Sequence, residues 1–220
     1  MSTLRLALAL LFITLAGASC FSALAQNCTL SGTPAWNSAL RNIVGDCSDD
    51  IISPSKRYTL HVSAEGAMSL STKVEQTKFR WNDAKLVPPA MLSWSPNSGA
   101  FFLNDGDGSG MASSFRFFRI NGTEVDEDDL IEKAAVSLYR RRTHCSASSA
   151  DPNVWGFGWG KNGGEIFLLV QPTVNESCGR PDDFISLIVR TSDGGIVGSL
   201  SKTQTEQRFR SQLPSSLFGH

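Results

Sequence analysis

The sequence lacks an excess of charge of either sign. Its 20 Lys and Arg residues face 21 Asp and Glu residues, which leaves a net charge of −1. Proteins that hold nucleic acid through bulk charge carry a strong positive excess, so this balance argues against a nucleic-acid partner. Apolar residues make up 41% of the chain and charged residues only 19%, a composition that excludes a disordered chain.

Long hydrophobic runs are also missing, except at the N-terminus. A 13-residue apolar run, Leu6–Ala18, follows a basic residue, and Ala23-Leu24-Ala25 fits the small-x-small pattern of a signal-peptidase site. We predict that residues 1–25 are a signal peptide, cleaved before Gln26, and that the protein is secreted or periplasmic. An anchor helix or a lipoprotein signal is the alternative. No later run reaches the 18 apolar residues of a membrane span, so we predict none after cleavage.

Cysteine is scarce, with five in the chain, and Cys20 leaves with the predicted signal. The remaining four suit disulfide bonds in an oxidising compartment: Cys28, Cys47, Cys145 and Cys178. Three pairings are possible, and the most economical joins the first cysteine to the second and the third to the fourth. Each bridge would then close a short loop, which is worth about 3 kcal/mol. The absence of a CxxC spacing disfavours zinc.

Short apolar runs bounded by Gly, Pro, Asn, Asp or Ser predict a mainly β protein. These runs cover 58–62, 91–94, 100–103, 115–120, 166–170 and 184–189. We expect residues 26–220 to form a single domain of blade-like antiparallel sheets, with one or two accessory helices. Residues 128–141 predict a helix, since apolar residues recur there at spacings of three and four, and a second helix is predicted near 200–212.

The first predicted helix begins with acidic residues and ends with Arg140, Arg141 and Arg142. Acid at the N-terminus and base at the C-terminus both complement the helix dipole, which is the simpler interpretation. Three adjacent arginines exceed what capping requires, however. They are therefore also a candidate binding patch for an anionic group on a partner.

A phrase of a turn followed by an apolar strand recurs along the chain. Its copies lie at 53–62, 92–105 and 157–170. Their turns contain Ser53-Pro54-Ser55-Lys56, Trp94-Ser95-Pro96-Asn97 and Trp159-Gly160-Lys161-Asn162. Two copies are followed by a strand, a polar-Gly turn and a return strand. These features resemble the TolB-type, WD-like β-propeller repeat, often written W-S-P-D-G. The resemblance implies a short or partial propeller-like array with blades near 51–70, 92–125 and 157–198. Asn97 departs from the usual Asp, and the first copy lacks the Trp.

Two further segments are candidate sites. Asp105, Asp107 and Ser109 place oxygen side chains at alternate positions of a Gly-rich loop, as in the first half of a calcium site. The bidentate position of the second half would be an arginine, so a plain hairpin tip is the alternative. Trp155 and Trp159 lie in an aromatic-Gly stretch and are candidates for a partner-binding surface, with packing between sheets as the alternative.

Templates for catalysis are missing. The chain contains no G-x-S-x-G motif, and no phosphate-binding loop opens a helix. His61 falls in a predicted strand and His144 in a predicted surface loop, where packed or exposed histidines are common. We predict no catalytic residue and no cofactor besides a candidate calcium ion. The predicted function is an exported binding protein of the propeller-repeat type, whose partner is a protein or a cell-envelope polymer. An envelope hydrolase with a carboxylate site, or a calcium-dependent structural module, is the alternative.

Overall fold

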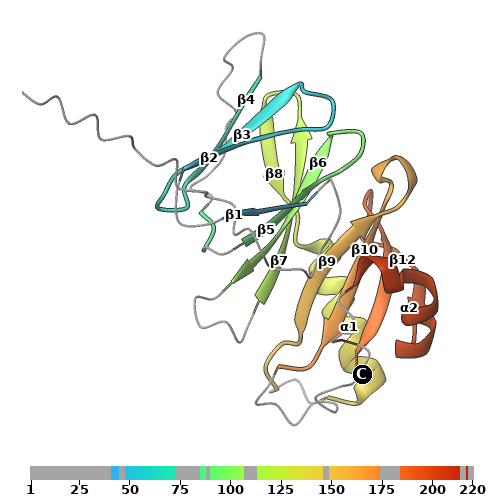
Figure 1. The fold of residues 1–220 in the computed structure, drawn as a ribbon. Helices are drawn as coiled ribbons and strands as arrows, with labels where there is room; N and C mark the ends of the chain where they lie inside the picture. The colour runs from blue at the N-terminus through green and yellow to red at the C-terminus, as the bar shows by residue number, and fades with distance from the viewer. Residues whose placement is uncertain are drawn as a thin grey trace, which may run out of the picture.

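The computed structural model describes residues 41–44, 48–72, 85–87, 90–106, 113–145, 149–173, 184–213 and 217. It contains three antiparallel sheets and two α-helices in this part of the chain, so the predicted mainly β fold is confirmed (Figure 1). No helix in the described ranges has the length and apolar character to cross a membrane.

Apart from β1, which joins the central sheet, the strands of the three sheets follow one another along the chain. The N-terminal sheet has the order β2-β3-β4, the central sheet β1-β5-β6-β7-β8 and the C-terminal sheet β12-β11-β10-β9. The first comprises β2 (Asp49–Ile52), β3 (Tyr58–Val62) and β4 (Met68–Thr72). The second comprises β1 (Arg41–Val44), β5 (Ala90–Trp94), β6 (Ala100–Gly106), β7 (Ser113–Asn121) and β8 (Glu124–Glu127). The third comprises β9 (Asn153–Trp159), β10 (Glu165–Gln171), β11 (Ile185–Arg190) and β12 (Ile196–Leu200).

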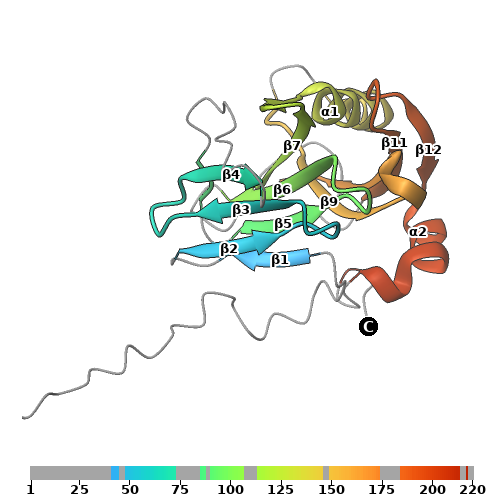
Figure 2. The same ribbon diagram turned by 90° about the horizontal axis from the view of Figure 1, so that it is seen from above.

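The central sheet is covered on both faces (Figure 2). On one face Leu92, Phe101 and Phe118 pack against the N-terminal sheet. On the other face Phe102 and Phe117 pack against the C-terminal sheet. Burial of both faces removes the polar positions that would otherwise alternate along a strand, which explains why β5 and β6 have such continuous apolar sequences.

Two helices complete the packing. Helix α1 (Leu130–Thr143) contacts β7, β9, β10 and β11, and buries Ile131, Ala135 and Tyr139 in the core between the central and C-terminal sheets. Helix α2 (Lys202–Phe209) packs on the outer face of the C-terminal sheet through Phe209. A short 3₁₀ turn, η2 (Arg210–Gln212), follows α2, and another, η1 (Lys161–Gly163), lies between β9 and β10.

All six strands predicted from apolar runs are present, and so are both helices. The first helix begins two residues later than predicted because Asp128 pairs with Arg119 and accepts a hydrogen bond from the Leu130 N–H at 2.9 Å. Its buried face also includes Tyr139, whereas Leu130 is 53% exposed. The apolar runs predicted neither β1, β2 and β4, which are at least half polar, nor β9, which is rich in glycine. The return strands of the repeated phrase correspond to β8 and β12.

The hairpin turns β2–β3, β5–β6 and β9–β10 share one pattern of backbone hydrogen bonds. In each, the N–H of the first turn residue donates to the carbonyl five residues later, and the N–H three residues on donates back to the first carbonyl. The first residues are Ser53, Ser95 and Gly160. The residue three positions later has positive φ in every case: 59° in Lys56, 61° in Ser98 and 73° in Gly163. Three segments with similar sequences therefore form turns with the same hydrogen bonds, although the third has a second residue with positive φ, Asn162.

These three turns also contact one another in series. The Ser55 N–H of the first turn donates to Ser98 Oγ of the second at 2.9 Å. Asn97 Nδ2 of the second turn donates to the Asn162 carbonyl of the third at 3.0 Å. The tryptophan before each of the last two turns packs onto the preceding sheet, Trp94 against Tyr58 and Trp159 against Phe102 and Phe117.

A buried amide joins the central sheet to the C-terminal sheet. Asn104 Nδ2 donates to the Gly156 carbonyl at 2.8 Å, and the Gly156 N–H donates to Asn104 Oδ1 at 2.7 Å. A Cβ at Gly156 would lie 2.7 Å from the Phe102 ring and 2.9 Å from the Phe115 ring. The glycine is therefore required for the close approach of the two sheets.

Candidate functional site

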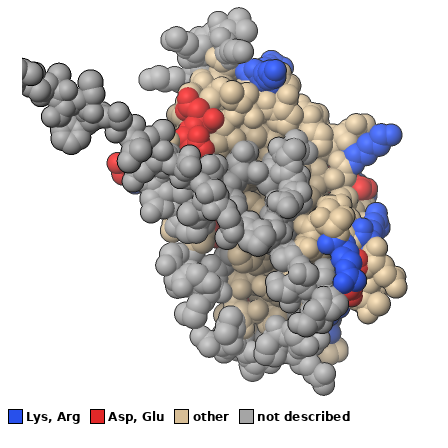
Figure 3. Space-filling view, in the orientation of Figure 1, with Lys and Arg blue, Asp and Glu red and all other residues tan. Residues whose placement is uncertain are grey.

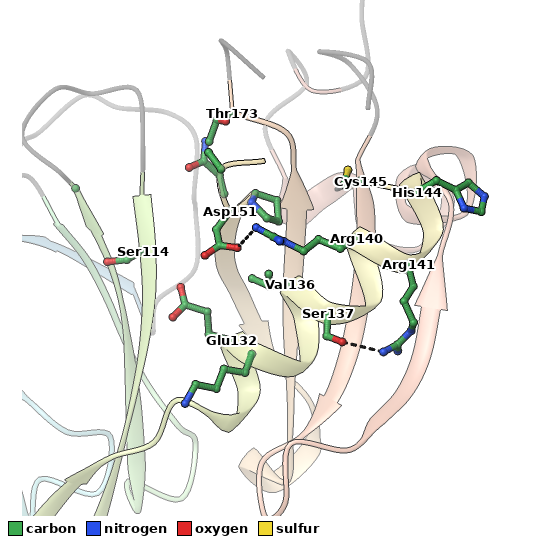
Figure 4. A pocket seen from close by; sticks show the side chains of 15 residues that line it. Ser114, Glu132, Val136, Ser137, Arg140, Arg141, His144, Cys145, Asp151 and Thr173 are labelled. Carbon is green, nitrogen blue, oxygen red and sulfur yellow. Dashed lines mark hydrogen bonds and ion pairs between the residues drawn. The ribbon is translucent and has the colours of Figure 1, made fainter. Parts of the chain in front are cut away.

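A cleft of about 1290 Å³ opens beside α1, where the ends of β6, β7, β9 and β10 meet the loop at 149–152 (Figure 4). Its lining contains acidic and basic side chains together with one histidine: Glu132, Asp151, Lys133, Arg140, Arg141 and His144. Ser114, Ser137, Asn153 and Thr173 add neutral polar groups. Sites of this kind, concave and with convergent polar groups, are the usual places for ligands.

Arg140 forms one wall of the cleft. Its guanidinium donates to Asp151 Oδ1 and to the Ser149 carbonyl, both at 2.7 Å. The Arg140 side chain is 22% exposed, whereas Asp151 is 71% exposed. This pair ties the C-terminal end of α1 to the loop before β9 and holds the guanidinium in a fixed position.

The other two predicted arginines lie differently. Arg141 is exposed, lines the cleft and donates from Nη1 to Ser137 Oγ at 2.8 Å, one turn earlier on α1. Arg142 is exposed and is not among the cleft residues. His144 ends the helix in the left-handed conformation and points away from the other labelled side chains in Figure 4. The arginine run thus contributes two side chains to the cleft.

Glu132 lies in the first turn of α1, at the opposite end of the helix from Arg140 and Arg141. Its Oε1 accepts a hydrogen bond from the Phe115 N–H at 3.2 Å. Burial raises the pKa of the Glu132 carboxyl, and repulsion from Asp151, Asp129 and Glu127 raises it further. The carboxyl groups of Glu132 and Asp151 point into the same space in Figure 4. The cleft therefore pairs an arginine-bound carboxylate, Asp151, with a carboxyl whose pKa is raised, Glu132.

The two predicted tryptophans lie on opposite faces of β9. A β-bulge places an extra residue, Phe157, in β9 opposite β10, and a bulge reverses the facing of the residues beyond it. Trp155 packs with the cluster under α2. Trp159 packs with the cluster between the central and C-terminal sheets, where its Nε1 donates to Ser93 Oγ at 3.0 Å. The structure does not bring the two rings onto a shared surface.

Asp105 of the predicted calcium loop is buried at the end of β6, where its carboxylate has protein partners. Oδ1 accepts from the Val87 N–H at 2.6 Å and Oδ2 from Arg116 Nη1 at 3.2 Å. Burial raises the pKa of Asp105, and these donors oppose the shift. Asp107 and Ser109 lie outside the described residues, and no cluster of metal-ligating side chains occurs within them. The calcium site stays a prediction.

The disulfide predictions also fall mainly outside the described ranges. Cys28, Cys47 and Cys178 are not described. Cys145 lies just after α1, lines the cleft, and has its Sγ 2.7 Å from Thr143 Oγ1. The two pairings therefore stay predictions, and so does the signal peptide.

Sequence reasoning missed Glu132 and Asp151, since no spacing distinguished them from the other acidic residues. A detectable signal was the position of Glu132 within the first turn of the predicted helix, opposite the arginines of the last turn. It also assigned no role to His61, whose ring bonds two side chains on the outer face of the N-terminal sheet. Alternating polar residues in strands β3 and β4 were the available signal.

Charged side chains are unevenly distributed over the face shown in Figure 3. Acidic side chains gather in a patch at the upper left, with a basic patch near it at the top, and most other basic side chains lie along the right side with a few acidic ones between them. Comparison with protein-family models gives no match, and a search of curated proteins gives none either.

Proposed function

We propose that the protein is an exported binding protein whose α1 cleft holds, without catalysis, a carboxylate-bearing partner, a protein or a cell-envelope polymer. The observation that carries the proposal is the pair of arginines from one helix end that line the cleft. Arg140 is held in place by Asp151 and Ser149, and Arg141 stands beside it at the surface. Guanidinium groups bind carboxylates with two parallel hydrogen bonds.

The two arginines would have different roles. Arg140 is largely buried and already bound, so it serves as a fixed wall with positive charge. Arg141 makes an exposed hydrogen bond to Ser137 within its own helix. A hydrogen bond of that kind contributes little to stability, so a carboxylate of the partner can replace it at small cost.

The propeller-repeat assignment is supported by the repeated turns. Three hairpins share the same hydrogen bonds and the same position of positive φ. The strands β5–β8 form a four-stranded meander, and so do β9–β12. Strands β2–β4 form a meander of three strands. Propeller blades are antiparallel sheets of this kind, stacked face to face.

Calorimetry on the full mature chain tests whether the partner is a polymer. It measures binding to soluble peptidoglycan fragments and to a carboxylated polysaccharide. A photo-crosslinking residue at Ser137 tests the protein arm, with the same residue at Arg142 as the control position. We expect Arg141→Ala to weaken binding about tenfold or more, since a charge-assisted hydrogen bond is worth about 1.5–3 kcal/mol. Arg142→Ala should leave it unchanged. Equal losses in both variants would contradict a role for the cleft.

A hydrolase is the second candidate, and a specific feature favours it. Burial raises the pKa of the Glu132 carboxyl, which suits a proton donor, and Arg140 donates a hydrogen bond to the neighbouring Asp151. Glycosidases use a pair of carboxyl groups, one of which donates a proton to the leaving group. Glu132→Gln should then abolish turnover of aryl glycosides without lowering partner binding. If the intact protein shows no turnover, the binding function alone stands.

A further inference from the structure

Three polar side chains on the outer face of the N-terminal sheet form a hydrogen-bonded chain. His61 Nδ1 lies 2.5 Å from Asp50 Oδ1, and His61 Nε2 lies 2.7 Å from Ser71 Oγ. The three residues come from three different strands, β2, β3 and β4. None of them belongs to the α1 cleft.

Strand register brings the three together. Asp50 lies directly opposite His61 in the β2–β3 pair, and His61 lies opposite Ser69, next but one to Ser71, in the β3–β4 pair. Residues two apart in a strand share a face. The opposite face of the same sheet carries Ile51, Leu60 and Leu70 and is buried in the core, so the polar set is directed outward by the burial of its neighbours.

The connectivity is that of an activated nucleophile. A carboxylate at Nδ1 orients the imidazole and stabilises its protonated form, while a hydroxyl at Nε2 can transfer its proton to the ring. The His61–Ser71 contact of 2.7 Å lies within the 2.6–3.2 Å reach of proton transfer, and the His61–Asp50 contact of 2.5 Å is slightly shorter. The carboxylate, the imidazole and the hydroxyl stand in the required order across adjacent strands.

We propose that Ser71 is a nucleophile that accepts acyl groups from small esters, with His61 as general base and Asp50 as the positioning residue. Ser71 Oγ bonds to the ester carbonyl carbon and its proton passes to His61 Nε2. The tetrahedral intermediate then collapses, the carbon–oxygen bond to the alcohol breaks, and His61 returns the proton to the departing alkoxide. Water repeats the sequence on the acyl-serine and releases the acid, so that ester and water yield acid and alcohol.

The setting of the three residues defines the substrate class. The side chains of His61 and Asp50 are 42% and 67% exposed, so a reagent reaches them without an opening step. An open sheet face offers little enclosure for a large ligand. Selection would therefore rest on the reactivity of the carbonyl, which favours small acyl groups with good leaving groups.

The chain supplies a matched control in Ser69. It lies on the same strand and the same outer face as Ser71, and it is exposed. The His61 ring nitrogens bond Asp50 and Ser71. A hydroxyl that reacts only because it is exposed would behave alike at both positions.

The test is labelling of the full mature protein with a fluorophosphonate, read by peptide mass spectrometry, together with release of p-nitrophenol from p-nitrophenyl acetate. We expect one adduct, on Ser71, and ester turnover. Both should fall about 10²-fold or more in Ser71→Ala and His61→Gln and persist in Ser69→Ala. Asp50→Asn should lower the labelling rate, with partial recovery in Asp50→Glu.

Circular dichroism confirms that each variant is folded, and the readout does not depend on any ligand of the α1 cleft. No adduct on Ser71 in the folded wild type would overturn the proposal. So would equal labelling of Ser69 and Ser71, or labelling of Ser71 that persists in His61→Gln.

Discussion

The N-terminal sheet and the central sheet use their two faces differently. Along β3 the residues alternate between buried and half-buried, whereas every residue of β5 is buried. The N-terminal sheet turns one face to solvent, and the central sheet lies between two others. Polar groups on the first are therefore accessible, while those on the second, such as Asn104, are buried and held by backbone groups of the neighbouring sheet.

The two sheets therefore contribute differently to stability and to the display of reactive side chains. A sheet that is covered twice carries most of the packing energy and tolerates few changes. A sheet that is covered once can display side chains at fixed spacing without loss of the core behind them. We expect the effects of substitutions on stability to follow this division.

Phe102→Ala should have the largest effect. The ring is fully buried and contacts Phe115 and Trp159 between the central and C-terminal sheets. Removal of a buried phenylalanine costs about 3–5 kcal/mol, and urea unfolding should show this loss. A loss below about 1 kcal/mol would mean that the sheets are not packed on each other as described.

Asn104→Leu should cost about 3 kcal/mol, because it leaves both the N–H and the carbonyl of Gly156 without their buried partner, at about 1–3 kcal/mol for each group. Chemical denaturation measures the change. Asn104→Asp is a useful companion, since it keeps an acceptor for the Gly156 N–H but loses the donor. Full stability in the leucine variant would contradict the inter-sheet tie.

Gly156→Ala should cost about 2 kcal/mol, the usual result of overpacking. The new methyl group would lie under 3 Å from the rings of Phe102 and Phe115. Gly164→Ala is the control, since nothing lies within 4 Å of a Cβ there. Thermal melts of the two variants should differ by several degrees.

Glu132→Gln should change the pH dependence of stability. The folded-state pKa of Glu132 is raised, so the native state binds this proton more tightly than the unfolded state. The stabilisation is full below the ordinary pKa near 4.5 and is lost as pH rises through the raised folded value. The variant should therefore melt higher than wild type at neutral pH, with the gain reduced below pH of about 4. An equal gain at both values would exclude Glu132 as its source.

Ser69→Ala should have the smallest effect, within about 0.5 kcal/mol, because exposed substitutions away from special features change little. Its side chain lies on the solvent face of β4. Equilibrium unfolding compares it with Leu70→Ala, the next residue on the buried face, which should cost about 2–5 kcal/mol. Similar losses in the pair would erase the distinction between the two faces.

The strands that could be predicted from sequence are mostly those with little exposure. Apolar runs identified β5, β6, β10 and β11 because burial of both faces produces an unbroken signal. Strand β2 was missed because two of its four residues are aspartates, which leaves no apolar run. Strand β9 was missed because glycine, which is rare in strands, is needed at Gly156 to admit the rings of the central sheet.

By itself the sequence determined the mainly β class, the acid-to-base polarity of α1 and the turns of the β2–β3, β5–β6 and β9–β10 hairpins. These features depend on residues close together in the chain. Only the tertiary structure could bring Arg140 to Asp151, or Asp50 and Ser71 to the two nitrogens of His61. Those contacts depend on strand register and on how sheets stack. Register follows from which face each strand buries against a distant partner, and such long-range pairing leaves no local pattern in the chain.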